Sequence, residues 1–155
     1  MTPNERIMID ELRSKGFSHA DISEIHKEDH VQPLMADVIL KWLPGIYKDH
    51  IGSGEHLIRA LITTEKPFDP SAIIDLFENS EYNSTLKCTM AYVLAISKTH
   101  DITDYMLDQL LNKESRFERA EFLDCLTRKP RFQNNSELIG FLKRLFDKYF
   151  YFETF

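Results

Sequence analysis

The sequence predicts an all-α fold in which helical hairpins stack on one another to form a solenoid. Three observations predict it: a recurring apolar triplet, a recurring apolar block between the triplets, and the scarcity of glycine, with five in 155 residues. Each triplet has two adjacent apolar residues and a third three positions later. Its four copies are Ile39-Leu40-Leu43, Ile73-Ile74-Phe77, Met106-Leu107-Leu110 and Leu138-Ile139-Leu142. The copies of the second block are Leu57-Ile58-Ala60-Leu61, Met90-Ala91-Val93-Leu94 and Phe122-Leu123-Cys125-Leu126.

Successive triplets lie 34, 33 and 32 residues apart. A paired apolar repeat of this length is typical of stacked helical hairpins, because one hairpin cannot bury its apolar face without a neighbour. The chain has the length of one domain. We expect three to four hairpins, with repeats over residues 31–128, an N-terminal cap over 1–30 and a C-terminal cap over 135–155.

The apolar periodicity places the individual helices between proline- and glycine-containing breakers. We expect a helix over about 3–15, ended by Gly16, a short one over about 18–27, hairpins over about 31–64, 69–98 and 102–128, and a last helix over about 135–150. The predicted turns and linkers are Pro44-Gly45, Gly52-Ser53-Gly54 and Lys66-Pro67-Phe68-Asp69-Pro70.

Short polar residues are expected to cap the helices, because their side-chain oxygens can accept hydrogen bonds from unpaired amides of the first turn. Asp69 before Pro70 has this pattern, and Ser71, Asp104 and Ser136 share one position just before a triplet. The apolar residues of the N-terminal pair are expected to cover the first repeat. They are Ile7, Ile9, Leu12, Phe17, Ile22 and Ile25.

Three segments resemble the short, degenerate HEAT-like repeats of bacterial proteins: LMADVILKWLP, GEHLIRALI and STLKCTMAYVLAISK. The resemblance extends over residues 31–148, whereas the Thr-Pro-Leu-His turn of ankyrin repeats and the Trp and Gly-x-x-Tyr positions of tetratricopeptide repeats are absent. It implies a right-handed superhelix of helix pairs whose second helices line a concave face. Most proteins of this kind are binding scaffolds, and a few use the concave face for catalysis.

The composition is that of a soluble globular protein, with 43% hydrophobic and 28% charged residues and a net charge of −6. No apolar stretch approaches the roughly 20 residues of a membrane-spanning helix, and no signal peptide is visible, so we expect a cytoplasmic protein without membrane contact. The charge is uneven: residues 1–111 hold 10 Lys/Arg and 18 Asp/Glu, whereas residues 112–148 hold 9 and 6. This asymmetry belongs either to a surface that steers a partner or to ordinary solvated helix faces.

The motifs of enzyme and cofactor sites are missing from the sequence. It has no Gly-x-Ser-x-Gly nucleophile motif, and Gly52-Ser53-Gly54 lacks the Lys-Ser/Thr of a phosphate-binding loop. His26 and His30 are four residues apart, as metal ligands on a helix can be, but Lys27 stands where a zinc-protease motif has Glu, which favours a solvated charged turn. Cys88 and Cys125 are expected to be free, mostly buried thiols. We therefore expect neither cofactor, metal nor catalytic residue.

The second helices also carry residues that the repeat does not need. The core uses the first, second, fourth and fifth positions of each second block, so the third position and the residues one turn away must point elsewhere. The resulting candidate partner-binding ridge consists of His56, Arg59, Thr89, Tyr92, Glu121, Asp124 and Arg128, with Thr63 and Ile96 in the same stripe. Arg, Tyr and carboxylates are residue types that anchor protein interfaces, although every amphipathic helix has a polar face of some kind.

A nucleic-acid-binding or base-processing solenoid is the alternative that the sequence leaves open. Its basis is the cluster Arg128-Lys129-Pro130-Arg131, to which Arg116, Arg119, Lys143 and Arg144 add. Glu114, Glu118 and Glu121 interrupt this cluster. The sequence therefore favours a non-enzymatic protein-binding scaffold with the size and acidity of a bacterial adaptor or a toxin-neutralising immunity protein.

The remaining aromatic features of the sequence are a single tryptophan and an aromatic C-terminus. Trp42 is expected to be half-buried near a hairpin corner. At the C-terminus, Phe141, Leu145 and Phe146 are expected to cap the end of the solenoid. Tyr151, Phe152 and Phe155 then remain for homodimerisation or partner binding, or for a disordered tail.

Overall fold

The computed structural model describes residues 1–112 and 117–153 and is all-helical over these residues, which confirms the all-α prediction. The elements are α1 (Pro3–Ser14), α2 (Ile22–Ile25), α3 (Pro33–Asp49), α4 (Ile51–Ala60), the 3-10 turn η1 (Leu61–Thr63), α5 (Ser71–Glu78), α6 (Ser84–Ile96), α7 (Thr103–Asn112), the 3-10 turn η2 (Phe117–Arg119), α8 (Ala120–Arg128), α9 (Pro130–Gln133) and α10 (Ser136–Glu153).

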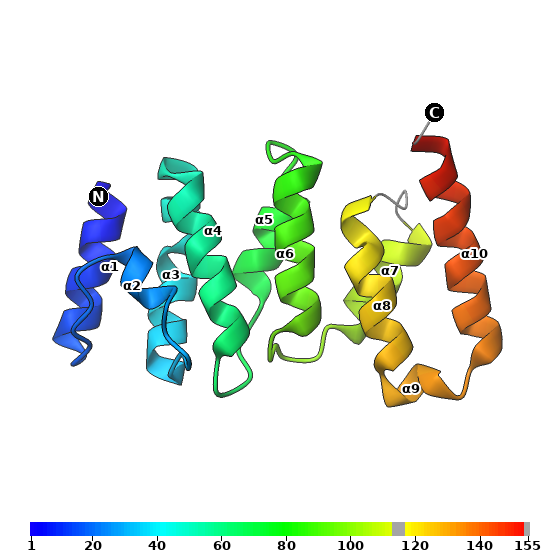
Figure 1. Ribbon diagram of the computed structural model, residues 1–155, viewed down its shortest axis with the longest axis horizontal. Helices are drawn as coiled ribbons and strands as arrows, with labels where there is room; N and C mark the ends of the chain where they lie inside the picture. The colour runs from blue at the N-terminus through cyan, green and yellow to red at the C-terminus, as the bar shows by residue number, and fades with distance from the viewer. Residues whose placement is uncertain (113–116, 154–155) are drawn as a thin grey trace.

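The helices follow one another along the long axis of the molecule, with α1 near one end and α10 at the other (Figure 1). Three hairpins, α3–α4, α5–α6 and α7–α8, form the body. Helix α3 packs on α1 and α5, whereas α4 packs on α2 and α6, and α6 packs on α8. The second helices α4, α6 and α8 therefore form one row, in front in Figure 1.

The apolar repeat forms the core. In α3, α5 and α7 the first and third residues of each triplet are buried and the second is half-buried. All four residues of the second block are buried in α4–η1 and in α6, whereas α8 buries Phe122 and Leu126 and leaves Leu123 and Cys125 half-buried. Equivalent positions thus do equivalent packing in successive hairpins, and this burial is the main favourable term holding neighbours together.

Backbone bridges join the two ends of the first two hairpins. The amide of Val31, just before α3, donates to the carbonyl of Thr63 at 3.0 Å, and the amide of Glu65 donates to the carbonyl of Val31 at 3.1 Å. Phe68 repeats this arrangement before α5, donating to Lys98 at 3.0 Å and accepting from His100 at 2.8 Å. Val31 and Phe68 are both buried, so the bridges fix the hairpin ends against the core.

The turn between α3 and α4 differs from the prediction. Pro44-Gly45 is not a turn, because α3 continues to Asp49 with Pro44 inside it, and Gly52 and Gly54 lie in the first turn of α4. A proline in a helix costs about 3 kcal/mol. The buried side chains of Leu43, Ile46 and Tyr47 on the same helix offset this, since each full burial contributes about 1.5–3 kcal/mol.

Gly54 is required by close packing at this turn. A Cβ added there would lie 2.7 Å from Cγ and 2.8 Å from Cα of Tyr47. Trp42, on the preceding turn of α3, is half-buried as expected, and its Nε1 donates to Glu11 Oε2 at 2.7 Å.

Asp69 accepts a hydrogen bond from the first amide of α5, which confirms its predicted capping role, whereas the capping oxygens of α7 and α10 come from residues earlier in the chain than predicted. Ser71 and Ser136 are the first residues of α5 and α10, and Asp104 is the second residue of α7. The amide of Ser71 donates to Asp69, that of Thr103 to Asp101 and that of Leu138 to Asn135, at 2.9–3.0 Å. Asp69 and Asp101 also accept from the hydroxyls of Ser71 and Thr103, and Asp21 binds Ser23 in the same way. An Asp-x-Ser/Thr motif therefore precedes three of the helices.

The N-terminal pair covers the first hairpin with most of the predicted residues. Helix α2 spans only Ile22–Ile25 and is therefore shorter than the predicted helix over about 18–27. Ile9, Leu12, Ile22 and Ile25 are buried and Phe17 is half-buried, but Ile7 is 49% exposed and Met8 takes the core position instead. His19 is also buried rather than at the surface, and its Nε2 lies 2.6 Å from Glu28 Oε1.

The packing at Gly54 predicts that Gly54→Ala destabilises the protein. Alanine favours a helix over glycine by about 1 kcal/mol, but overpacking against Tyr47 costs about 1–3 kcal/mol or more. We expect a lower urea midpoint for Gly54→Ala. Gly140→Ala in α10 is the control, because its Cβ would meet only Nη1 at the flexible end of the exposed Arg144 side chain, and it should be neutral or stabilising. Equal midpoints for the two variants would contradict the close packing.

The capping motif predicts a specific acid sensitivity. Hydrogen bonds from the hydroxyl and then the amide of Ser71 lower the pKa of Asp69, and Thr103 does the same for Asp101. Because the pKa values of the folded state are lowered, this stabilisation is present above the unfolded pKa of about 3.9 and is lost as pH falls through the folded pKa. Asp69→Asn/Asp101→Asn keeps the acceptor oxygens but cannot titrate.

Thermal midpoints measured between pH 7 and pH 2.5 test this prediction. The thermal midpoint of the parent should be higher than that of the double variant at pH 7. The difference between the two midpoints should shrink as pH falls below the unfolded pKa. Asp75→Asn, at an exposed position inside α5, serves as the control and should run parallel to the parent. If the thermal midpoint of the double variant shows the same pH dependence as that of the parent, the caps are not the acid-sensitive groups.

Candidate functional site

The predicted ridge lies on the exposed face of the row α4, α6 and α8. His56, Arg59, Tyr92, Asp124 and Arg128 are exposed, whereas Thr89 and Glu121 are half-buried. The helices are held in this orientation by the second-block residues, whose burial turns the third position of each block outward. The ridge is therefore continuous along one side of the molecule, and its three parts differ in chemistry.

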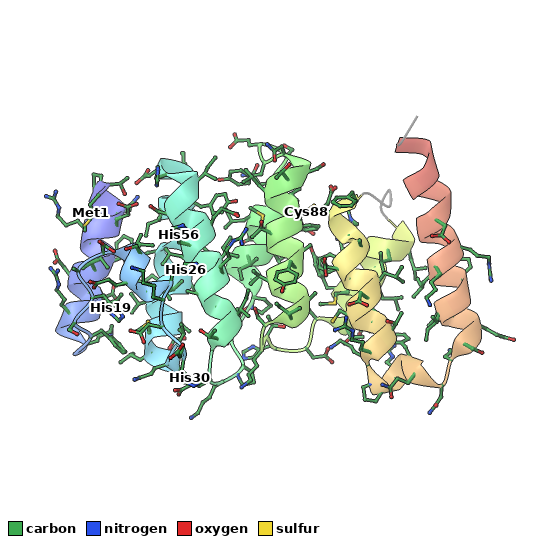
Figure 2. All side chains as sticks on the ribbon, in the orientation of Figure 1. Met1, His19, His26, His30, His56 and Cys88 are labelled. Carbon is green, nitrogen blue, oxygen red and sulfur yellow. The ribbon has the colours of Figure 1, made fainter. Side chains whose placement is uncertain are left out.

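The N-terminal part of the ridge contacts other residues of the chain. The ring of His56 stacks on that of His26 at the end of α2, with centroids 4.9 Å apart and an interplanar angle of 21°. Both residues are labelled in Figure 2, where they lie next to each other. Arg59 lies 3.7 Å from Glu55, whose other oxygen accepts from the hydroxyl of buried Tyr47 at 2.7 Å. Both ridge residues therefore contact other residues of the chain, and both remain exposed.

The central part is an exposed apolar strip on α6. Tyr92 is 44% exposed and Ile96, one turn later, is 41% exposed. Neither is needed for the packing of the hairpins, since Met90, Ala91, Val93 and Leu94 fill the core positions of this helix. Large apolar side chains on adjacent turns of one exposed helix face are suited to contact with another protein.

The C-terminal part contains a pocket. This ridge pocket has a volume of about 370 Å³ and lies between the end of α6 and helix α8. Its lining residues are Ala95, Ile96, Glu121, Asp124, Cys125, Arg128, Lys129 and Pro130. Three of the predicted residues, Glu121, Asp124 and Arg128, thus meet the exposed strip, and within the pocket the guanidinium of Arg128 donates to Asp124.

The ridge pocket also contains Cys125, which the sequence assigned to the core. The thiol is free and half-buried, and its Sγ donates to the carbonyl of Ala95 at 3.2 Å. Burial raises the pKa of Cys125, while Lys129 and Arg128 act in the opposite direction. Cys88 is likewise half-buried, and burial followed by the charges of Glu118 and Glu121 raises its pKa. Since the thiolate is the reactive form, neither residue has the environment of an activated nucleophile.

Sequence reasoning missed a second pocket. This corner pocket, of about 390 Å³, lies between the α6–α7 connection and the α8–α9 corner. Its lining residues are Leu94, Ala95, Ser97, Thr99, His100, Asp101, Ile102, Thr103, Met106, Cys125, Lys129, Pro130 and Arg131. The only signal in the sequence was the polar run from Ser97 to Asp101, which the prediction treated as a connection, and helix α9 was not predicted.

The basic cluster does not form one open cationic surface. Arg128 pairs with Asp124, and Arg131 lies 2.7 Å from Asp104. Arg119 is mostly buried, lies over the ring of Phe77 and donates to Gln109 at 3.2 Å. Lys143 and Arg144 are exposed on α10, and Arg116 lies outside the described residues.

The aromatic C-terminus is described only in part. Phe141 is exposed and Leu142 takes the buried position, so the prediction that Phe141 caps the stack is wrong. The side chains of Leu145, Phe146, Tyr151 and Phe152 and all of Phe155 lie outside the described part of the structure.

Over residues 1–112 and 117–153, no group of three or more metal-ligating side chains converges on one point. His26 and His30 are both exposed, as expected of a charged turn. Nor does any helix of this described part have the length and apolarity needed to cross a membrane. Comparison of the chain with protein-family models, with curated proteins and with solved structures found no match.

Proposed function

We propose that this chain is a non-enzymatic protein-binding scaffold of the cytoplasm, built as a right-handed HEAT-like superhelix whose second helices present the binding face. The observation that supports it most is the exposed strip of Tyr92 and Ile96 beside the ridge pocket. Aromatic side chains and arginine are enriched at the centres of protein interfaces, where pockets receive anchors from the partner.

The chemistry of the ridge also suits a protein more than a small molecule. The ridge pocket joins a long exposed face, and two of its four charged groups, Asp124 and Arg128, already pair with one another. A partner can pack its apolar groups on Tyr92 and Ile96 while its polar groups contact the charged rim. The acidity and small size of the chain suit a bacterial adaptor or an immunity-type protein that neutralises a toxin.

Affinity capture with ridge variants tests the proposal. The parent chain, immobilised, should retain a partner from the lysate of the source organism, and Tyr92→Ala/Ile96→Ala should lose it. Truncation of a central interface residue costs about 2 kcal/mol, so the dissociation constant of the purified complex should rise by about 30-fold or more. The matched control is Ile7→Ala/Leu34→Ala, which removes equally exposed apolar side chains from α1 and α3.

The control variant should retain the partner. Both double variants should lose a similar, modest amount of thermal stability and remain folded in the assay, because the substituted side chains are 41–49% exposed. If the Tyr92→Ala/Ile96→Ala variant captures the same proteins with the same affinity as the parent, the ridge is not the binding face.

The ion pairs of the basic cluster predict weak contact with nucleic acid. Arg128 and Arg131 already have carboxylate partners, and the chain has a net charge of −6. We expect no measurable binding of a labelled DNA duplex, even at low salt, in a fluorescence-anisotropy titration. Tight binding that falls steeply with salt concentration would instead favour a nucleic-acid-binding solenoid.

A further inference from the structure

The first two hairpins are each closed by a backbone bridge, and no such bridge closes the third hairpin in the described part of the structure. Val31 and Phe68, the bridge residues, each donate to a carbonyl after the second helix and accept from the amide two residues later. The corresponding groups after α8 are the carbonyl of Lys129 and the amide of Arg131. This carbonyl already accepts from two amides of α9, which occupies both of its lone pairs.

The run before α7 also lacks a residue that could close the third hairpin. Phe68 lies three residues before α5, and the residue three positions before α7 is His100. The amide of His100 is already bonded to Phe68 in the bridge of the second hairpin. The corner pocket lies between the two segments that a third bridge would join, since residues 100–103 line one side and residues 129–131 the other.

The segment that follows α6 therefore has one paired edge and one free edge. Successive residues of an extended segment turn their backbone groups to opposite edges. Lys98 and His100 bond to Phe68 on one edge. Thr99 and Asp101 face the other edge, and both line the corner pocket. Among the described residues, nothing bonds to the carbonyl of Thr99 or to the amide of Asp101. These two groups repeat the acceptor and donor that bind Phe68.

The floor of the corner pocket suits an apolar side chain. Leu94 and Met106 are almost fully buried there, and Ile102 is half-buried beside them. The bridge residues of the first two hairpins, Val31 and Phe68, are apolar and buried as well. The chain thus shows twice which kind of residue fills this position.

The charges around the corner pocket do not call for an ion. Arg131 lies 2.7 Å from Asp104, and Lys129 and Arg131 are both close enough to Asp101 to act on its charge. Two cations are therefore matched by two carboxylates. An uncharged occupant leaves this balance unchanged, whereas an ionic side chain of either sign would disturb it.

The corner pocket and the ridge pocket are neighbours. They share four lining residues, Ala95, Cys125, Lys129 and Pro130. A protein bound over the ridge pocket therefore lies beside the free edge of the segment after α6.

We propose that the third hairpin binds an extended segment of the partner protein as the bridge that it lacks. One residue of this segment donates its amide to the carbonyl of Thr99, accepts from the amide of Asp101 and places an apolar side chain in the corner pocket. This rests on the proposed protein-binding function of the ridge. Addition of a strand to a free backbone edge is a general mode of peptide recognition, in which backbone bonds give affinity and side-chain pockets give specificity.

Two matched peptides test the inference on the full chain by NMR. The probe is acetyl-Ser-Thr-Phe-Thr-Ser amide, and its partner is the same peptide with an N-methyl group on the Phe amide. We expect the probe to shift the backbone amides of Thr99, Asp101 and Ile102. The N-methylated peptide should bind at least about fivefold more weakly, since one net hydrogen bond contributes ~1 kcal/mol. Exchange of Phe for Glu or for Lys in the probe should weaken binding to a similar extent.

A substitution that fills the corner pocket is the second test. Ile102 lines this pocket and not the ridge pocket, so Ile102→Phe should abolish the shifts that the probe causes. Ile62→Phe is the matched control, because Ile62 is also half-buried but lies at the end of the first hairpin, and it should leave the affinity unchanged.

Four results would overturn the inference: equal affinity for the probe and its N-methylated form, tighter binding of the Glu or Lys peptide, shifts confined to other amides, and no shift at millimolar probe. Shifts of the same amides that grow with protein concentration in the absence of peptide would also overturn it, because the occupant would then be a second copy of this chain.

The failures of the two proposals are distinguishable. If Tyr92→Ala/Ile96→Ala loses the captured partner but the two peptides bind equally, the ridge binds protein without an added strand. If the probe binds at the corner pocket and N-methylation weakens it while capture survives in the ridge variant, the strand site stands and the ridge function fails.

Discussion

Each hairpin of this protein has apolar side chains on more than one side, and they leave water only when neighbouring hairpins pack against them. The triplet residues of α3 and α5 and the second-block residues of α4 and α6 meet this constraint with the same positions each time. Ends are then the weak points of the stack, because an end hairpin lacks one neighbour. The pair α1–α2 covers one end through α3 and α4, and α10 covers the other through contacts with α7, α8 and α9.

The same constraint determines which residues are exposed on the proposed binding face. Since four of five positions in each second block point into the core, the remaining position and its neighbours one turn away must be exposed on one face. The face is regular along α4 and α6, but α8 ends at Arg128 and the chain turns into the short helix α9. The repeat is interrupted at this corner, and both pockets beside Lys129 lie here. Helices α4 and α6 thus present a regular exposed face, whereas the α8–α9 corner has pockets and charged side chains.

Sequence reasoning predicted what depends on helical period and little of what depends on tertiary contacts. The buried triplets and the exposed ridge follow from periodicity, so both could be read directly. Pro44-Gly45 was predicted as a turn because proline and glycine usually end a helix. The helix continues through them because it buries Leu43, Ile46 and Tyr47. The cap of α5 at Asp69 was predicted, but the capping oxygens of α7 and α10 were misplaced by three residues and by one residue, which is within the ordinary uncertainty of helix ends. The corner pocket combines residues more than 30 positions apart, and no local pattern contains it.

On the proposed binding face, Tyr92 and Ile96 are the residues that an ordinary solvated helix face would not need. A solvated face is satisfied by Lys, Glu and similar residues, whose long stems also cover neighbouring apolar surface. Two large apolar side chains one turn apart, each more than two-fifths exposed, leave apolar surface in contact with water. They would also favour non-specific association if nothing covered them. The charged residues around them are Glu121, Asp124 and Arg128. They limit such association because an unsuitable partner would remove their water without offering polar contacts in its place. If the ridge is the binding face that we propose, an apolar strip with a charged rim selects a partner that matches both parts.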